Sequence, residues 1–133
     1  MNFVQVAIPS PLRQTFTYKN QFSSNLVGKR VLVEFGRRKL VGIVISQSRN
    51  FDDSYKLKQI YEVLDDSPLF DKQALKKIIN IANYYMHPIG IVFESFIPSF
   101  LRKAKHQKTL EKYVIKIDSD NAIKSLHTLT TVS

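Results

Sequence analysis

The chain lacks cysteine and tryptophan, and its 133 residues include only four glycines. The absence of cysteine excludes disulfides, thiolate metal ligands and a cysteine nucleophile. The glycines are too few and too scattered for a dinucleotide fingerprint, and no Gly-x-x-x-x-Gly-Lys-Ser/Thr phosphate loop or Gly-x-Ser-x-Gly elbow occurs. No apolar run approaches the ~20 residues of a membrane span. Residues 1–6 lack the basic start and long apolar core of a secretory signal.

Acidic residues are also scarce, with 11 Asp and Glu against 20 Lys and Arg and a formal net charge of +9. Such an excess indicates a polyanionic partner, most often a nucleic acid. The hydrophobic content of 44% is sufficient for a folded core. The length fits one domain, or one domain with a fragment of another. The missing cysteines are compatible with a reducing cytoplasm.

Candidate catalytic and metal-binding groups are weak. Two carboxylate pairs, at residues 52–53 and 65–66, lie in polar stretches and are interpreted as solvated turn residues. His87, His106 and His127 are widely spaced and lack the repeats typical of metal ligands. We therefore predict no active site and no metal site.

Residues 31–45 are the strongest local pattern in the chain, because two β-branched runs flank a short basic turn. Gly36 can adopt the positive φ that a tight turn requires, so a β-hairpin with a loop of a few residues is predicted. Its tip carries Arg37, Arg38 and Lys39 without an acid among them. This tip is either a solvated edge that discourages strand aggregation or an anion-binding loop.

Three further segments, at residues 3–8, 15–18 and 58–64, have the β-branched and aromatic content of strands. In the last of them, Ile60 and Leu64 would share one face. These segments are expected to complete the sheet around the hairpin.

The apolar period becomes helical after residue 70 and predicts a helix over 72–86, with Asp71 as its N-cap and an end before Pro88. Its expected inward residues are Leu75, Ile78, Ile79, Ala82 and Tyr85. Residues 89–96 fit either a second short helix or a strand; a helix would turn Ile91, Val92, Ser95 and Phe96 inward. The predicted class is α+β: a small, mostly antiparallel, barrel-like sheet with one long helix and a basic C-terminal tail.

The composition changes near residue 101. Residues 1–101 are interpreted as one domain and residues 102–112 as a basic linker. Residues 113–133 contain one strand candidate, at 113–117, which cannot bury a core by itself. They are interpreted as the start of a truncated second domain.

Five short motifs occur in order over residues 3–101. They are Val6-Ala7-Ile8-Pro9-x-Pro11-Leu12-x-x-Thr15-Phe16-x-Tyr18, Gly28-x-Arg30-Val31-x-Val33-x-Phe35-Gly36-Arg37-Arg38, Val41-Gly42-Ile43-Val44, Lys58-x-Ile60-x-Glu62-Val63-Leu64-Asp65 and Ala82-x-Tyr84-Tyr85-x-x-Pro88-Ile89-Gly90. Together they resemble the N-terminal 3′-DNA-binding domain of the PriA family, the primosomal protein N′ helicases of bacterial replication restart. The resemblance implies binding of the 3′-terminal nucleotide of the nascent leading strand at a stalled fork, with little base preference.

The resemblance also implies site residues. Phe16 matches the pocket phenylalanine of the family, Gly36 the turn glycine that approaches the nucleotide, and Lys58 the pocket lysine. The family normally has an aspartate where this chain has Thr17, so one formal charge and one acceptor oxygen are replaced by a hydroxyl. On charge grounds, the three cations of the hairpin tip are expected to contact phosphates.

The implied partner is DNA, at forks and recessed 3′ ends, with primosome proteins and single-stranded-DNA-binding protein as further candidates and no membrane. The implied location is the bacterial cytoplasm, at the nucleoid. The family continues into a winged-helix domain, helicase lobes that bind ATP and a zinc-binding region. Apart from residues 113–133, which would begin the winged helix, these parts have no counterpart here. We therefore expect neither enzymatic activity nor a cofactor.

Two alternatives remain open. The chain could be a truncated remnant that acts only as a protein-interaction module, with its basic surface docked on an acidic partner, or that retains no function. It could also be an unrelated basic RNA-binding protein.

Overall fold

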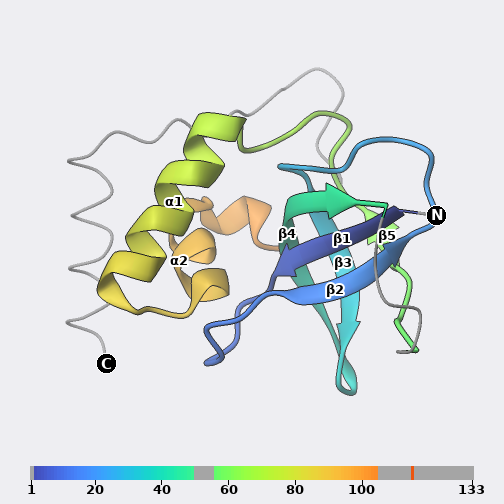
Figure 1. The fold of residues 1–133 in the computed structure, drawn as a ribbon, viewed down its shortest axis with the longest axis horizontal. Coiled ribbons are helices and arrows are strands. Elements are labelled where there is room, and N and C mark those ends of the chain that lie inside the picture. The colour runs from blue at the N-terminus through green and yellow to red at the C-terminus, as the bar shows by residue number, and fades with distance from the viewer. Residues whose placement is uncertain (1, 50–55, 105–114, 116–133) are drawn as a thin grey trace.

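The computed structural model describes residues 2–49, 56–104 and 115. Within these residues, five strands form one antiparallel sheet in the order β2-β1-β4-β3-β5. Two helices lie together on one side of this sheet, and the β3–β4 hairpin projects away from them (Figure 1). In chain order the elements are β1 (Asn2–Ala7), β2 (Phe16–Asn20), β3 (Arg30–Phe35), β4 (Arg38–Ser48), β5 (Glu62–Val63), α1 (Lys72–Tyr85), α2 (Ile89–Phe96) and a 3₁₀ turn (Ser99–Leu101).

The structure confirms the α+β class but not the barrel-like closure, because the sheet is open with β2 and β5 at its edges. An isolated parallel bridge between Lys19 and Gln59 nevertheless links β2 to the segment that precedes β5. The Lys19 amide donates to the Lys58 carbonyl at 2.9 Å, and the Ile60 amide donates to the Lys19 carbonyl at 3.1 Å. This segment therefore passes between the two edges of the sheet and brings Lys58 beside β2.

The strand predicted at residues 58–64 is much shorter in the structure. The segment bonds first to β2 and then to β3, through the Tyr61 amide to the Leu32 carbonyl at 2.9 Å, so it forms no long ladder with either strand. Ile60 and Leu64, which the alternation was expected to place on one face, are both buried.

Both faces of the sheet are covered by apolar side chains. Successive strand residues point to opposite faces, so the strands contribute to two separate clusters. One cluster lies mainly among the strands and consists of Val4, Val6, Ile8, Tyr18, Leu26, Val31, Val33, Val44 and Ile60. The other lies between the sheet and the helices and includes Ala7, Ile43, Leu69, Phe70, Leu75, Ile78, Val92 and Phe93. Half-buried Phe16, Phe35 and Leu40 pack against the first cluster.

Helix α1 begins where the sequence predicts. The Asp71 side chain accepts a hydrogen bond from the Ala74 amide at 2.7 Å, and Met86 caps the other end in the left-handed conformation at φ 56°. The prediction that Tyr85 faces inward is wrong, because its side chain is 49% exposed. The buried stripe of the helix ends at Ala82, and the last turn extends past the core.

Residues 89–96 form a second helix, α2, so the expectation of one long helix was incomplete. Of the four residues expected to face inward only Val92 is buried, and the others on the buried face are Ile89, Gly90 and Phe93. The cause is a close backbone contact, since a Cβ on Gly90 would collide with the Ile8 carbonyl. The glycine therefore faces the sheet and sets the rotation of the helix.

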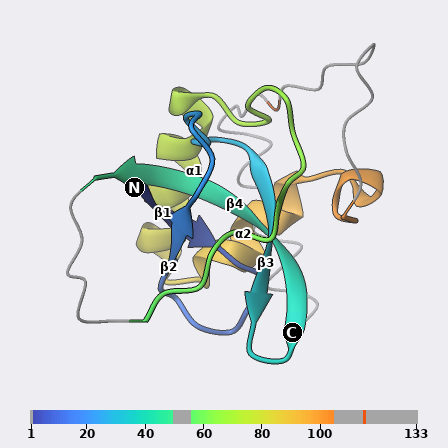
Figure 2. The same ribbon diagram turned by 90° about the vertical axis from the view of Figure 1, so that its right-hand side faces the viewer.

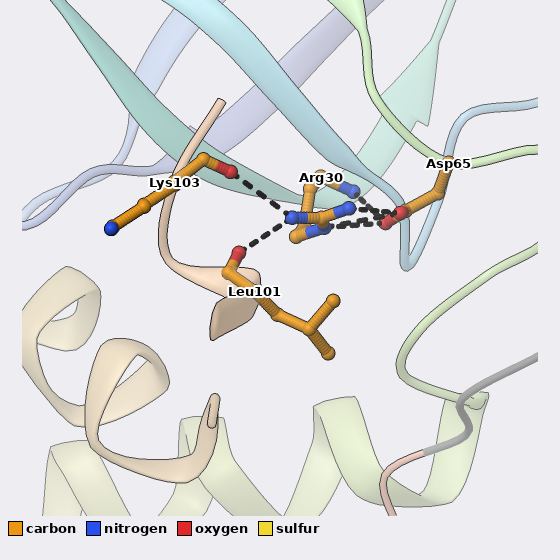
Figure 3. A network of polar contacts seen from close by, with 4 residues as sticks. All are labelled: Arg30, Asp65, Leu101 and Lys103. Carbon is orange, nitrogen blue, oxygen red and sulfur yellow. Dashed lines mark hydrogen bonds and ion pairs between the residues drawn. The ribbon is translucent and has the colours of Figure 1, made fainter. Parts of the chain in front are cut away.

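The interpretation of Asp65 as a solvated turn residue is wrong. Its carboxylate is buried and forms an ion pair with Arg30, with 2.8 Å between Nη2 and Oδ1 (Figure 3). The Arg30 guanidinium also donates through Nη1 to the carbonyls of Leu101 and Lys103. Asp66, by contrast, is exposed, and the pair at 52–53 lies outside the described residues.

Little of the tail is described. The Ile115 amide donates to the Leu69 carbonyl at 2.8 Å, and Ile115 forms a bridge with Phe70. The rest of the predicted strand at 113–117, and the predicted linker beyond residue 104, lie outside the described residues. Among the residues that the structure covers, no helix is long and apolar enough to cross a membrane.

Candidate nucleic-acid interface

The hairpin tip is a two-residue turn, shorter than the predicted loop of a few residues. Phe35 pairs with Arg38 across the strands, so Gly36 and Arg37 form the turn. Gly36 has a φ of +62°, a conformation that glycine adopts without strain at the first position of such turns. A Cβ placed on Gly36 would meet nothing within 4 Å, so the backbone here borders open space. A ligand can therefore approach the main chain at the turn.

An aromatic pair lies beside this turn. The rings of Phe16 on β2 and Phe35 on β3 are 4.8 Å apart between centroids and inclined at 69°, in edge-to-face contact. Arg38 is directly opposite Phe35 in the antiparallel register, so both side chains project on the same face. Both rings are half-buried and Arg38 is exposed, which places an exposed cation next to an aromatic surface.

The other face of the hairpin carries a carboxylate between two lysines. Glu34 Oε2 lies 3.8 Å from Lys58 Nζ, and both side chains are about half exposed. Glu34 is also directly opposite Lys39 in the register of β3 and β4. Lys39 Nζ lies 3.6 Å from the ring centroid of Tyr61, an exposed cation–π contact.

Tyr18 connects the two strands of the site. Its hydroxyl donates to the main-chain carbonyl of Glu34 at 2.7 Å. Burial raises the pKa of the Tyr18 phenol, and the negative charge of Glu34 raises it further. Since Tyr18 is two residues from Phe16 and Glu34 adjoins Phe35, this hydrogen bond fixes the strands that hold the aromatic pair.

Thr17 faces away from the aromatic pair. It follows Phe16 in a strand, so its side chain projects from the opposite face of β2. Its hydroxyl accepts a hydrogen bond from Gln5 Nε2 at 2.8 Å, and Gln5 Oε1 in turn accepts one from the Thr15 hydroxyl at 3.1 Å. The Thr17 hydroxyl is therefore held by β1.

The structure thus brings together most of the residues singled out in the sequence. Phe16 lies beside the Gly36 turn through Phe35, and Lys58 reaches the same end of β3 through Glu34. Sequence reasoning missed Phe35, Glu34 and Tyr61 as members of this surface. The position of Phe35 directly before Gly36 was an available signal, whereas the contacts of Glu34 and Tyr61 depend on distant pairing.

Chemically, this end of the molecule offers cations, aromatic rings and accessible backbone. Cations neutralise phosphates, and aromatic rings stack on bases without strong sequence preference. Figure 2 shows that the hairpin tip stands clear of both helices. No group of three or more His, Asp or Glu side chains among the described residues could hold a metal ion. The surface is therefore suited to binding a polyanion with exposed bases.

Comparison with known proteins gives a consistent result. The family model of the PriA 3′ DNA-binding domain matches residues 5–98. The replication restart protein PriA of Buchnera aphidicola subsp. Acyrthosiphon pisum is 36% identical over 103 residues, which cover 76% of this chain and 14% of that protein. PriA of Haemophilus influenzae is 36% identical over 107 residues, covering 79% and 15%, and that of Treponema pallidum 30% over 119 residues, covering 84% and 18%. The matched part is thus less than a fifth of each relative.

Proposed function

The chain belongs to the PriA 3′ DNA-binding domain family, and from this we propose that it binds DNA at a 3′ end through the tip of the β3–β4 hairpin. The observation that carries the proposal is the Phe16–Phe35 pair, with exposed Arg38 on the same face and the open backbone of Gly36 next to it. A terminal base packs against the rings, and the backbone of Gly36 allows the nucleotide to come close.

The remaining contacts with DNA are made by cationic side chains of the hairpin and of the segment before β5. Arg37, Arg38 and Lys39 are exposed on the turn and the first residues of β4, where they neutralise the phosphates nearest the end. Lys58 approaches from the segment beside β2 and contacts the terminal nucleotide. Thr17 contributes through its main chain, because its side chain projects from the face of β2 opposite the aromatic pair, where Gln5 donates to its hydroxyl.

We further propose that this binding serves replication restart, at forks and recessed 3′ ends of the nascent leading strand, in the bacterial cytoplasm at the nucleoid. The match is to the DNA-binding domain and not to the helicase portion, so the chain is proposed to act by binding and not as an enzyme. Primosome proteins and single-stranded-DNA-binding protein are further proposed partners.

Fluorescence anisotropy with a labelled duplex carrying a recessed 3′ end tests the proposal. The double variant Arg37→Ala/Arg38→Ala is expected to lower affinity about tenfold or more and to reduce the salt slope by about 2, since each lost phosphate contact removes about one unit. The control Lys72→Ala/Lys76→Ala removes the same charge from the exposed side of α1 and is expected to change little. Equal losses in both variants would mean that net charge alone attracts DNA.

The same titration distinguishes the alternatives. Unchanged affinity in the hairpin variant would favour a protein-interaction module whose basic tip meets an acidic partner. Tighter binding to single-stranded RNA than to recessed-end DNA would favour an RNA-binding protein. A blunt duplex of equal length serves as the reference for recognition of the end.

A further inference from the structure

Tyr61 places an aromatic ring on the face of the sheet opposite the Phe16–Phe35 pair. It follows Ile60, which is buried in the cluster among the strands, so the Tyr61 side chain projects away from that cluster. Phe16 and Phe35 pack against the same cluster and therefore lie on the other side. The contact of the ring with Lys39, which adjoins the residue opposite Phe35 in the ladder, gives the same placement.

The Tyr61 ring is held in a fixed position but remains accessible. Its main-chain amide donates to the Leu32 carbonyl at 2.9 Å, which fixes the residue against β3, and Tyr61 is 55% exposed. The Lys39 ammonium lies 3.6 Å from the ring centroid, so one face of the ring meets a solvated group and not the core. A base stacked on an aromatic ring is held more strongly than an exposed cation, so a base can displace Lys39.

The proposed binding of a 3′ end leaves a second base without a partner. In a duplex with a recessed 3′ end, the terminal base is paired with a base of the template strand. Stacking of the terminal base on the Phe16–Phe35 pair takes it out of the duplex, so the template base opposite becomes unpaired as well. The turn of Gly36 and Arg37 is only two residues long, so strands on the two faces of the hairpin are separated by one layer of sheet.

We propose that Tyr61 stacks the unpaired template base opposite the 3′-terminal nucleotide, so that the hairpin holds one DNA strand on each face. This inference rests on the proposed binding of 3′ ends and extends it to the second strand. Lys39, released from the ring, is then available to a neighbouring phosphate. Stacking on a ring tolerates any base. The contact therefore distinguishes a recessed end within a duplex from the 3′ end of a single strand, without reading sequence.

The experiment compares two duplexes with a recessed 3′ end by fluorescence anisotropy. Both carry a mismatch at the 3′-terminal nucleotide, so that the cost of unpairing does not differ between them. In one duplex the template base opposite this nucleotide is present, and in the other it is replaced by an abasic site. The wild-type chain is expected to bind the duplex with the base about tenfold more tightly, the scale of one base stacked on an aromatic ring.

Variants of Tyr61 assign this preference to the ring. Tyr61→Ala is expected to bind both duplexes equally, with the affinity that the wild-type chain has for the abasic duplex. Tyr61→Phe is expected to keep the preference, because stacking does not require the hydroxyl. Tyr84→Ala removes an exposed tyrosine from α1 and is the matched control, which should also keep it. All four chains are expected to bind the recessed strand alone, as single-stranded DNA, with the same affinity.

The outcomes separate this inference from the proposed function. Absence of wild-type binding to any 3′ end would overturn the proposed function. Binding without a preference for the template base, or a preference that survives in Tyr61→Ala, would overturn only the role of Tyr61. An equal loss by Tyr61→Ala on the duplexes and on the single strand would also overturn it, since the ring would then support the 3′ end itself. Thermal unfolding verifies the fold of each variant, and the wild-type comparison requires no substitution.

Discussion

The two ends of β3 carry the same kind of ion pair in opposite surroundings. At the start of the strand, Arg30 and Asp65 are fully buried as side chains, with 2.8 Å between Nη2 and Oδ1. Near its other end, Glu34 and Lys58 are about half exposed and lie 3.8 Å apart. A single strand thus joins a buried pair that holds the fold to an exposed pair at the proposed binding surface.

Solvent determines what each pair can do. In the buried pair, Asp65 accepts hydrogen bonds from the Arg30 main chain at 2.8 Å and from its guanidinium, and two main-chain carbonyls accept hydrogen bonds from Arg30 Nη1. Loss of one partner there leaves a charge without compensation in the interior. At the exposed end, water solvates Glu34 or Lys58 at little cost when its partner moves away. Either side chain can therefore leave the ion pair and contact a ligand.

The largest expected effect is at the buried end. Asp65→Ala is expected to reduce the free energy of unfolding by about 3–5 kcal/mol, because Arg30 would remain charged and buried without its carboxylate. Urea denaturation followed by circular dichroism measures this loss. The double variant Arg30→Met/Asp65→Leu removes both charges and is expected to recover most of it. Equal destabilisation by the single and double variants would show that packing, and not an unpaired charge, is responsible.

An intermediate effect is expected at Tyr18, which joins the exposed end of β3 to β2. Tyr18→Phe removes the hydrogen bond to the Glu34 carbonyl and should cost about 1 kcal/mol at neutral pH. The pKa of this phenol is raised in the folded state, so folding favours the protonated form. The contribution of Tyr18 is therefore complete below pH 10 and is lost as the pH rises above that value.

Denaturation of wild type and variant across this pH range measures the difference, which should shrink in alkali. Tyr84→Phe, at a tyrosine that is 81% exposed on α1, is the control and should show no such change. A difference that grows with pH would contradict the assignment.

The smallest expected effect on stability is at the exposed pair. Lys58→Ala or Glu34→Ala should change the free energy of unfolding by no more than about 0.5–1 kcal/mol, since water solvates the remaining partner. The same urea experiment measures it. A loss comparable to that of Asp65→Ala would remove the contrast between the two ends of β3.

Local patterns in the sequence were sufficient for much of the fold. The hairpin around Gly36 and the start of α1 at Asp71 each depend on residues within one turn or one strand pair, and the structure confirms both. The face of α2 was not predictable, because it is set by the fit of Gly90 against Ile8, 82 residues earlier in the numbering. Helical periodicity alone contains no information on that contact.

The candidate site, like the fold, was predictable from the sequence only in part. Family resemblance indicated Phe16, Gly36 and Lys58, and the structure places them around one end of β3. The partners that complete this surface are Glu34 and Tyr61, whose contacts arise from the pairing of β3 with segments about 25 residues away. A charged residue in a polar stretch looks the same in sequence whether it is solvated or, like Asp65, buried against an arginine.

The hydrogen bonds from Arg30 to the carbonyls of Leu101 and Lys103 have a geometric consequence. They attach the main chain after the 3₁₀ turn to the first residue of β3, while the hairpin tip begins where that strand ends. Five residue steps of extended strand measure about 17 Å. The strand therefore sets the separation between the Arg30 hydrogen bonds at one end of the domain and the hairpin tip at the other.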